Sequence, residues 1–155
     1  MTKAMCPGSF DPPTNGHVDV IERAIEAFGD VHVAVIDNPS KSGFFTVKER
    51  VAMLEAIFGD RAQVTSFTGL LVDHARNMDA GVVVKGLRTA DDYDYELQMA
   101  QMNRQLTGME TVFMATKPEW SYVSSSLVKE VAKLGGQVGG LVPDVVENAL
   151  KERLQ

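Results

Sequence analysis

Residues 6–20 read CPGSFDPPTNGHVDV, a stretch that joins the end of one apolar run to the start of an amphipathic one. The run KAMC at 3–6 predicts a short buried strand. From His17 onward, apolar side chains recur at helical spacing, at Ile21, Ala24, Ile25 and Phe28. The glycines and prolines between the two runs predict a rigid turn, so the chain opens with a strand, a turn and a helix.

The same alternation of strand and helix repeats along the chain. Short runs rich in β-branched residues predict strands at 31–36, 62–67, 81–86 and 110–116. Helical patterns lie between and after them, at 46–59, 69–78, 91–106, 124–135 and 143–154. Thr46 and Glu49 have the spacing of a capping box at the start of the second helix.

Strands that alternate with helices and are apolar on both faces predict a parallel sheet covered on both sides, with right-handed crossovers. The predicted fold class is α/β, a doubly wound five-stranded parallel sheet with two C-terminal helices. The 155 residues suit one domain over 1–155, and neither a repeat nor a linker interrupts them.

Composition limits the classes of function. The chain is 45% hydrophobic and 23% charged, as expected for a globular protein, and its net charge is −6. An acidic chain disfavours general nucleic-acid binding. One cysteine, Cys6, excludes an internal disulfide, and no apolar run has membrane-spanning length. We therefore expect a cytoplasmic protein without nucleic-acid or membrane partners.

Chemically distinctive segments follow every predicted strand. They are PGSFDPPTNGH after the first, DNPSKSGFF after the second, TGLL after the third, KGLRT after the fourth and TKPEWSYVSSS after the fifth. In an open α/β sheet, ligands bind outside the carboxyl ends of the strands. The clustering of these segments at one edge predicts the site.

His17 follows Gly16 in the first turn of a helix, where free N–H groups and the helix dipole favour phosphate. The same field disfavours a protonated imidazole, so we expect a neutral His17 that donates to a phosphate oxygen. The alternative is a capped helix in which His17 is half-exposed and binds no ligand. This segment alone favours the two interpretations equally. Cys6 and His17 have no further ligands at metal spacing, so no protein-built metal site is expected.

The other segments also have simpler interpretations. Lys85 and Arg88 supply a point charge and a planar fork for phosphate oxygens, or they form a solvated basic pair. SSS at 124–126 offers hydroxyls beside helix N–H groups, or serves only as a helix cap. Taken singly, Lys41 and Glu96 are most often solvated, and Met99 and Met102 most often pack in a core or an interface.

In combination, these segments resemble bacterial phosphopantetheine adenylyltransferases, nucleotidyltransferases with a [T/H]-x-G-H motif. The resemblance runs almost end to end, through PGSFDPPTNGH, NPSK, FTVKER, KGLR, DYDYELQMAQMNRQL and EWSYVSSSLVKEVA. It implies transfer of the adenylyl group of ATP to 4′-phosphopantetheine, which gives dephospho-CoA and pyrophosphate in coenzyme A biosynthesis. It also implies Mg²⁺ bound with ATP, a homohexamer, and coenzyme A as a feedback ligand.

The resemblance also assigns roles to residues. His17, Lys41 and Arg88 are the implied catalytic residues. Ser9, Lys41, Leu71 and Lys85 are the implied phosphopantetheine contacts. The implied ATP contacts are Ser9, Phe10, His17, Gly86, Leu87, Arg88, Glu96, Trp120, Ser121, Tyr122, Val123, Ser124, Ser125 and Ser126.

Three positions depart from related sequences. Thr14 stands where related cytidylyltransferases have a first histidine, which favours the pantetheine enzyme. Lys85 stands where many members have arginine, and Cys6 replaces a common tyrosine. Two alternatives stay open: a cytidylyltransferase-like enzyme that uses another phosphorylated acceptor, and a non-catalytic nucleotide-binding domain on the same fold.

Overall fold

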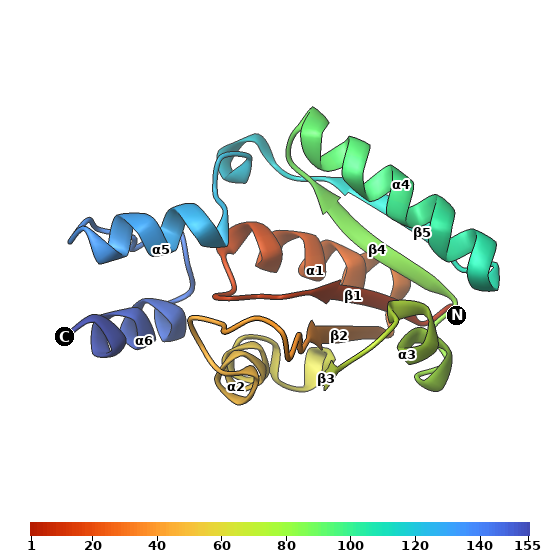
Figure 1. Cartoon of the computed structure of the whole chain (residues 1–155), viewed down its shortest axis with the longest axis horizontal. Coiled ribbons are helices and arrows are strands. Elements are labelled where there is room, and N and C mark those ends of the chain that lie inside the picture. Colours follow the sequence, from red (N-terminus) through yellow and green to blue (C-terminus); the bar gives the residue numbers. More distant parts are fainter.

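A five-stranded, all-parallel sheet forms the centre of the computed structural model, which describes residues 1–155 (Figure 1). The strand order is β3-β2-β1-β4-β5. This arrangement confirms the doubly wound α/β fold, and all five strands lie where the sequence predicts them. Their bounds are β1 Ala4–Gly8, β2 Val31–Ile36, β3 Gln63–Phe67, β4 Val82–Leu87 and β5 Glu110–Ala115.

Six α-helices and two 3₁₀ turns connect and follow the strands. The helices are α1 Asn15–Phe28, α2 Val47–Phe58, α3 Leu71–Asn77, α4 Ala90–Thr107, α5 Ser125–Lys133 and α6 Asp144–Leu154; the 3₁₀ turns are η1 Gly59–Arg61 and η2 Pro118–Trp120. The predicted capping box of α2 is present, because Thr46 and Glu49 each accept the other's backbone N–H.

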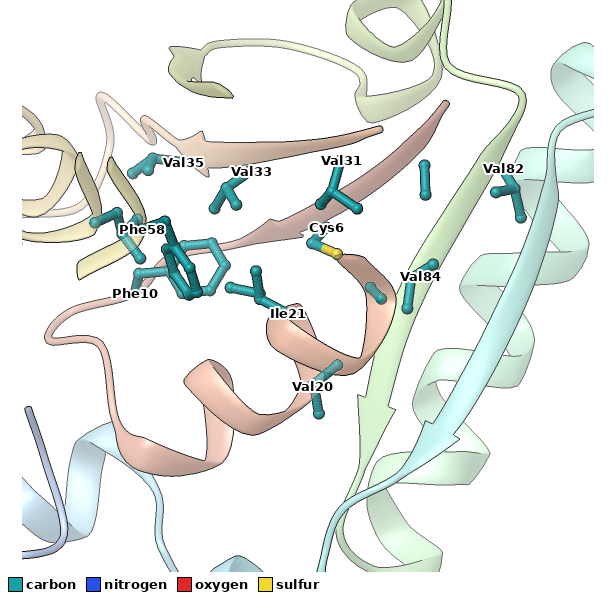
Figure 2. Packing of buried hydrophobic residues seen from close by; sticks show 13 residues of the cluster. Cys6, Phe10, Val20, Ile21, Val31, Val33, Val35, Phe58, Val82 and Val84 are labelled. Carbon is teal, nitrogen blue, oxygen red and sulfur yellow. The ribbon is translucent and has the colours of Figure 1, made fainter. Parts of the chain in front are cut away.

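The largest core cluster lies between one face of the sheet and helices α1 and α2. Figure 2 shows Ile21 of α1 beneath the strand side chain Cys6, and Phe10 beside Phe58. Val20 of α1 and Val84 of β4 belong to the same cluster. Thirteen buried residues make up this cluster, so it is the main apolar contact that fixes α1 to the sheet. The position of α1 matters because its first turn carries His17.

A second cluster packs on the opposite face, where Met5, Ala34 and Val83 contact Val72 and Ala75 of α3. Right-handed crossovers place α4 on this face too, where it also contacts α3. The prediction that every strand is buried on both faces is wrong. Only β1, β2 and β4 are well buried on both faces. The outer strands β3 and β5 have a strand on one side only and keep partly exposed residues.

Helix α4 is poorly covered by the rest of the chain. Asn103 is its only buried residue. Met99 and Met102, expected in a core or an interface, are 40% and 55% exposed, so they are not part of this chain's core. Tyr95 and Leu106 continue the same helix face and are also exposed.

The two C-terminal helices pack on the rest of the fold rather than standing apart from it. Val128 of α5 and Val146 and Leu150 of α6 form a third cluster with Phe45 and Met53. In Figure 1 these helices lie on the side of the sheet to which the strand arrows point. None of the helices combines the length and the apolar character needed to cross a membrane.

Strands β1 and β4 separate toward their carboxyl ends. β1 pairs with β2 along its whole length to Gly8, but its pairing with β4 stops at Met5. Beyond that point β4 pairs only with β5, as far as Leu87. Figure 1 shows the two strands diverging in this direction. The order of the strands reverses between β1 and β4, and a cleft opens at that switch point.

Candidate active site

The cleft at the switch point has a volume of about 350 Å³, within the range of small-molecule sites. The strands β1 and β4, the helices α1, α4 and α5, and the three loops that follow β1, β4 and β5 contribute to it, as the strand-end prediction requires. Its lining residues are Cys6, Pro7, Gly8, Ser9, Phe10, Thr14, Gly16, His17, Val20, Ile21, Val84, Lys85, Gly86, Arg88, Asp92, Glu96, Thr116, Val123, Ser124, Ser125 and Ser126.

His17 occupies the third position of α1 and has a fixed orientation. The backbone N–H of Thr14 donates to its Nδ1 over 3.0 Å, and the Thr14 hydroxyl accepts the backbone N–H of His17. This reciprocal cap requires a lone pair at Nδ1, so in the neutral ring Nε2 carries the hydrogen. The ring of Phe10 contacts His17 edge-on, with ring centroids 5.0 Å apart. His17 therefore offers an N–H donor at the wall of the cleft.

The pKa of His17 is lowered to about 4, chiefly by burial and in addition by the positive charges of Arg88 and Lys85. The imidazole is therefore neutral at pH 7. Two nearby cations would repel an imidazolium, but they favour an anionic ligand in the same space. The electrostatics of the cleft suit a neutral donor beside bound phosphate.

Lys85, near the carboxyl end of β4, pairs with Glu96 of α4 over 3.3 Å. Both side chains are about three-quarters buried, with 24% and 20% exposed. The pair crosses from the sheet to the helix and lies in the cleft wall. The structure therefore brings these two predicted residues together, and the ammonium of Lys85 already has an anionic partner.

Arg88 is held in a comparable way. Its Nε donates to Asp92 over 3.1 Å, and its Nη1 donates to the carbonyl of Val123 over 3.3 Å. The second contact joins the end of β4 to the segment that leads into α5. Asp92 was not among the predicted site residues, although its i+4 spacing from Arg88 is visible in the sequence.

Gly86 lies between these two cations and permits a close approach of β4 to α1. A Cβ atom there would lie 2.9 Å from Cγ2 of Val20, too close for an ordinary contact. Gly16 differs, because a Cβ there would find its nearest protein atom, Oγ1 of Thr14, at 3.5 Å. The packing of the helix therefore does not require a glycine at position 16, and the missing side chain leaves open space in the cleft.

The turn at Ser9 and Phe10 is fixed by a residue that sequence reasoning missed. Arg50 of α2 is buried, and its guanidinium donates to the carbonyls of Ser9, Ile36 and Phe45 over 2.7, 3.1 and 3.2 Å. Phe10 adopts φ 48°, a conformation unusual for a large side chain. Its buried ring and the bond from Arg50 to the preceding carbonyl hold it there. Arg50 belongs to FTVKER, but the motif alone does not reveal these contacts.

The three serines at the start of α5 have different surroundings. Ser124 is the helix cap and accepts the N–H of Leu127 over 3.1 Å. The hydroxyl of Ser125 donates to the carbonyl of Pro12 over 2.7 Å. All three serines line the cleft together with Val123. The capping interpretation of SSS is therefore correct for Ser124, and it does not exclude a ligand at the same helix start.

The start of α1 is also tied to a distant part of the chain. The backbone N–H of Asn15 donates to the carbonyl of Leu141 over 2.9 Å, and its side-chain amide donates to that of Gly140 over 2.8 Å. Asn15 lies two residues before His17. The loop between α5 and α6 thus supports the turn that carries the histidine.

Comparison with known proteins agrees with this geometry. A cytidylyltransferase-like family model matches residues 5–131. Phosphopantetheine adenylyltransferase of Nocardioides sp. is 56% identical over 99% of this chain and 98% of its own length. The proteins of the same name from Streptomyces coelicolor and Frankia casuarinae are 51% and 52% identical, over 99% or more of each chain.

This chain belongs to the phosphopantetheine adenylyltransferase family.

Not every site residue implied by the resemblance to phosphopantetheine adenylyltransferases reaches the cleft in this structure. Lys41 lies on an exposed turn after β2, and Leu71 starts α3. The other residues of that set outside the lining are Leu87, Trp120, Ser121 and Tyr122. Trp120 packs close to Gly16 at the edge of the cleft, since a Cβ on Gly16 would lie 3.6 Å from its Cβ.

The loop that carries Lys41 is held at its two ends but not at its tip: at the end next to β2, the backbone N–H of Asp37 donates to the carbonyl of Phe67 over 2.8 Å. Asp11 accepts the backbone N–H groups of Phe44 and Phe45, each over 2.8 Å, and Lys129 lies 3.6 Å from the same carboxylate. These bonds fix the end of the loop next to α2. The tip at 38–43 makes its hydrogen bonds only within itself, between Asn38, Ser40 and Lys41.

Proposed function

We propose that this chain transfers the adenylyl group of ATP to 4′-phosphopantetheine, giving dephospho-CoA and pyrophosphate, a step of coenzyme A biosynthesis. The observation that carries the proposal is the orientation of His17, a neutral donor beside Lys85 and Arg88 in a cleft of suitable size. The names and the full-length similarity of the relatives support the same reaction.

The nucleophile is the phosphate of the acceptor, whose second ionisation near pH 6 leaves it largely dianionic at neutral pH. One of its oxygens attacks the α-phosphorus of ATP, and the bond from that phosphorus to the bridging oxygen of pyrophosphate breaks. The attacking group carries no proton to remove, so no general base is needed. The protein's task is to hold two polyanions in line and to stabilise the charge that develops.

His17 is the proposed donor to an α-phosphate oxygen, through Nε2–H. Lys85 and Arg88 stabilise the charge on the phosphates, and a single donor of this kind typically contributes a factor of about 10² to 10³ in rate. Lys41, on its exposed turn, is a proposed phosphate contact that requires movement of the loop. The remaining contacts implied by the resemblance, from Ser9 to Ser126, are proposed as ligand contacts on the same basis.

Mg²⁺ is proposed to enter with ATP. The cleft carboxylates of Asp92 and Glu96 are engaged by Arg88 and Lys85, so they are not free ligands for an ion. Phosphate oxygens are ligands that Mg²⁺ prefers, and the triphosphate itself supplies them. When bound there, the ion neutralises part of the negative charge of the nucleotide.

A homohexamer is also part of the proposal. The exposed apolar face of α4, with Tyr95, Met99, Met102 and Leu106, supports burial against another copy of the chain. Light scattering should give six times the chain mass of 16.9 kDa. A monomer at micromolar concentration would contradict this assembly. Coenzyme A as a feedback ligand is proposed from the resemblance alone, and a cytoplasmic location from the cysteine content of the chain.

Pyrophosphate release is the decisive test of the reaction. With Mg²⁺, we expect release from ATP only when 4′-phosphopantetheine is added. ATP, CTP, GTP and UTP are compared side by side, because the matching family model is described as cytidylyltransferase-like. Preference for CTP would support the cytidylyltransferase alternative. ATP binding without any pyrophosphate release would support the non-catalytic one.

A further inference from the structure

Asp19 of α1 is a buried carboxylate outside the cleft, two residues after His17. Its side chain is only 6% exposed, and it does not line the cleft. Oδ2 accepts from Nη1 of Arg23 over 3.1 Å, and Oδ1 lies 3.1 Å from Nζ of Lys117. The carboxylate therefore uses both oxygens, one toward its own helix and one toward the segment after β5.

These two cations extend the contact to the end of β5. Nη1 of Arg23 also donates to the carbonyl of Ala115, the last residue of that strand, over 2.9 Å. Lys117 immediately precedes η2, which ends at Trp120. Asp19 thus ties α1 to the first residues of the segment 116–126. That segment contributes five lining residues to the cleft, Thr116 and Val123 to Ser126.

Burial makes this contact unlike the other ion pairs of α1. Removing a carboxylate from water is costly unless charge and hydrogen bonds compensate it, and Asp19 has both. Glu22 on the same helix also pairs with an arginine, Arg61, but those side chains are 45% and 53% exposed. Exposed pairs of that kind contribute little. Glu22 is therefore a matched control for Asp19.

We propose that Asp19 is a positioning residue for the nucleotide half of the cleft: it holds segment 116–126 against α1 and so determines the KM for ATP. The proposal rests on the proposed function for its kinetic consequence. Its structural consequence is independent of activity. Segment 116–126 holds Trp120, the only tryptophan of the chain, so fluorescence reports on the segment directly.

The first test compares Asp19→Asn with Glu22→Gln. The asparagine keeps the size of the side chain but turns an NH₂ group toward one of the two cations. We expect acrylamide to quench Trp120 more strongly in Asp19→Asn, with the quenching of Glu22→Gln unchanged. Unchanged quenching in a folded Asp19→Asn would overturn the proposal, whether or not the protein has adenylyltransferase activity.

The second test is kinetic. In Asp19→Asn the KM for ATP should rise about fivefold, equivalent to about 1 kcal/mol, while the KM for 4′-phosphopantetheine changes less than about twofold. Equal rises in the two KM values indicate general loosening of the fold and contradict the assigned role, as does an unchanged KM for ATP.

Lys117→Met guards against a folding defect in Asp19→Asn, because Lys117 is 55% exposed and its replacement leaves the core intact. It removes the one cation that joins Asp19 to the segment beyond β5. In Lys117→Met we expect a selective rise in the KM for ATP and an increase in the quenching of Trp120. Both changes should be smaller than in Asp19→Asn. If the KM for ATP and the quenching of Trp120 in Lys117→Met both equal the wild-type values, the proposal is overturned, even if Asp19→Asn does not fold.

Discussion

The backbone N–H of Thr14 donates a 3.0 Å hydrogen bond to Nδ1 of His17, so the residue that caps α1 also selects the tautomer of the histidine. One local motif thereby stabilises a helix start and orients a donor toward the cleft. The Thr14 hydroxyl also lies 3.3 Å from Nδ1, so the backbone and the side chain of Thr14 both contact the ring.

The first prediction concerns the protonation of His17. Its pKa of about 4 means that the ring stays neutral, with the hydrogen on Nε2, throughout the working range of pH. Nitrogen-15 NMR of the three histidines should show one ring in this tautomer down to about pH 5. Titration of His17 near pH 6.5 would contradict the assigned environment. The acid limb of kcat/KM should then follow the substrate phosphate, near pH 6.

The second prediction concerns turnover. His17→Ala should lower kcat by a factor of about 10² to 10³, since it removes one donor to the developing charge. Some stability is lost as well, about 1 kcal/mol, because the side chain accepts the Thr14 N–H in the reciprocal cap. Pyrophosphate release and urea unfolding measure the two effects separately. His74→Gln is the control for turnover only, because His74 lies outside the cleft. Near-normal turnover in His17→Ala would remove His17 from its role.

The third prediction concerns the charge at position 85. Lys85→Met should raise the KM for 4′-phosphopantetheine and lower kcat, because a phosphate contact is lost and Glu96 keeps an unpaired charge in the cleft wall. The double variant Lys85→Met, Glu96→Gln should recover binding only in part. Lys48→Met, an exposed change on α2, is the control. If Lys85→Met and Lys48→Met have the same KM for 4′-phosphopantetheine and the same kcat, Lys85 is no substrate contact.

The fourth prediction concerns stability in mild acid. Nε2 of His32 lies 2.6 Å from Oγ1 of Thr65, which in turn lies 3.3 Å from Nε2 of His74. The Thr65 hydroxyl has one hydrogen and can donate it to only one of the two rings. The other ring must therefore donate its own N–H to the hydroxyl oxygen. The ring that accepts from the hydroxyl must be neutral. His32 is completely buried, so a positive charge on its ring would be costly.

Burial lowers the pKa of His32 and of His74. Nearby charges act on His32 in both directions, since His74 and Lys3 lower its pKa further while Asp30 raises it. The unfolded chain, with pKa values near 6.5, binds more protons below that pH than the folded chain does. The free energy of unfolding must therefore fall as the pH drops below about 6.5.

Urea unfolding at pH 7.5 and pH 5.5 measures this dependence. His74→Gln should reduce the difference between the two conditions, because one of the titrating groups is gone. Because the pKa of His17 is also lowered, His17 makes the free energy of unfolding decrease further as the pH drops from about 6.5 to 4. Equal stability at the two pH values would contradict the neutral pair.

Local patterns were sufficient to predict the elements of this fold. The strand at 31–36 and the capping box of Thr46 and Glu49 were predicted correctly, because both depend on residues within one turn or one strand. The edge on which the site lies also followed from local patterns, since all parallel strands share a carboxyl end. His17, Lys85, Arg88 and Glu96 do meet there.

Contacts between remote segments could not be predicted in the same way. Arg50 and Asp19 look like ordinary surface charges of amphipathic helices, and only the packed structure shows that they are buried. Conversely, Lys41 was expected in the site but lies outside the cleft, because nothing in the sequence fixes the conformation of its turn. The burial of a charge depends on which segments pack on it, information that spacing alone does not contain.

The bonds from Asn15 to the carbonyls of residues 140 and 141 have a consequence for synthesis. The helix start that presents His17 emerges from the ribosome well before its supports, which follow 125 residues later in the case of Gly140. A nascent chain with β1 and α1 already formed still lacks these supports and the α5 serines. Catalytic competence should thus be acquired late in translation, after all five strands of the sheet have been made.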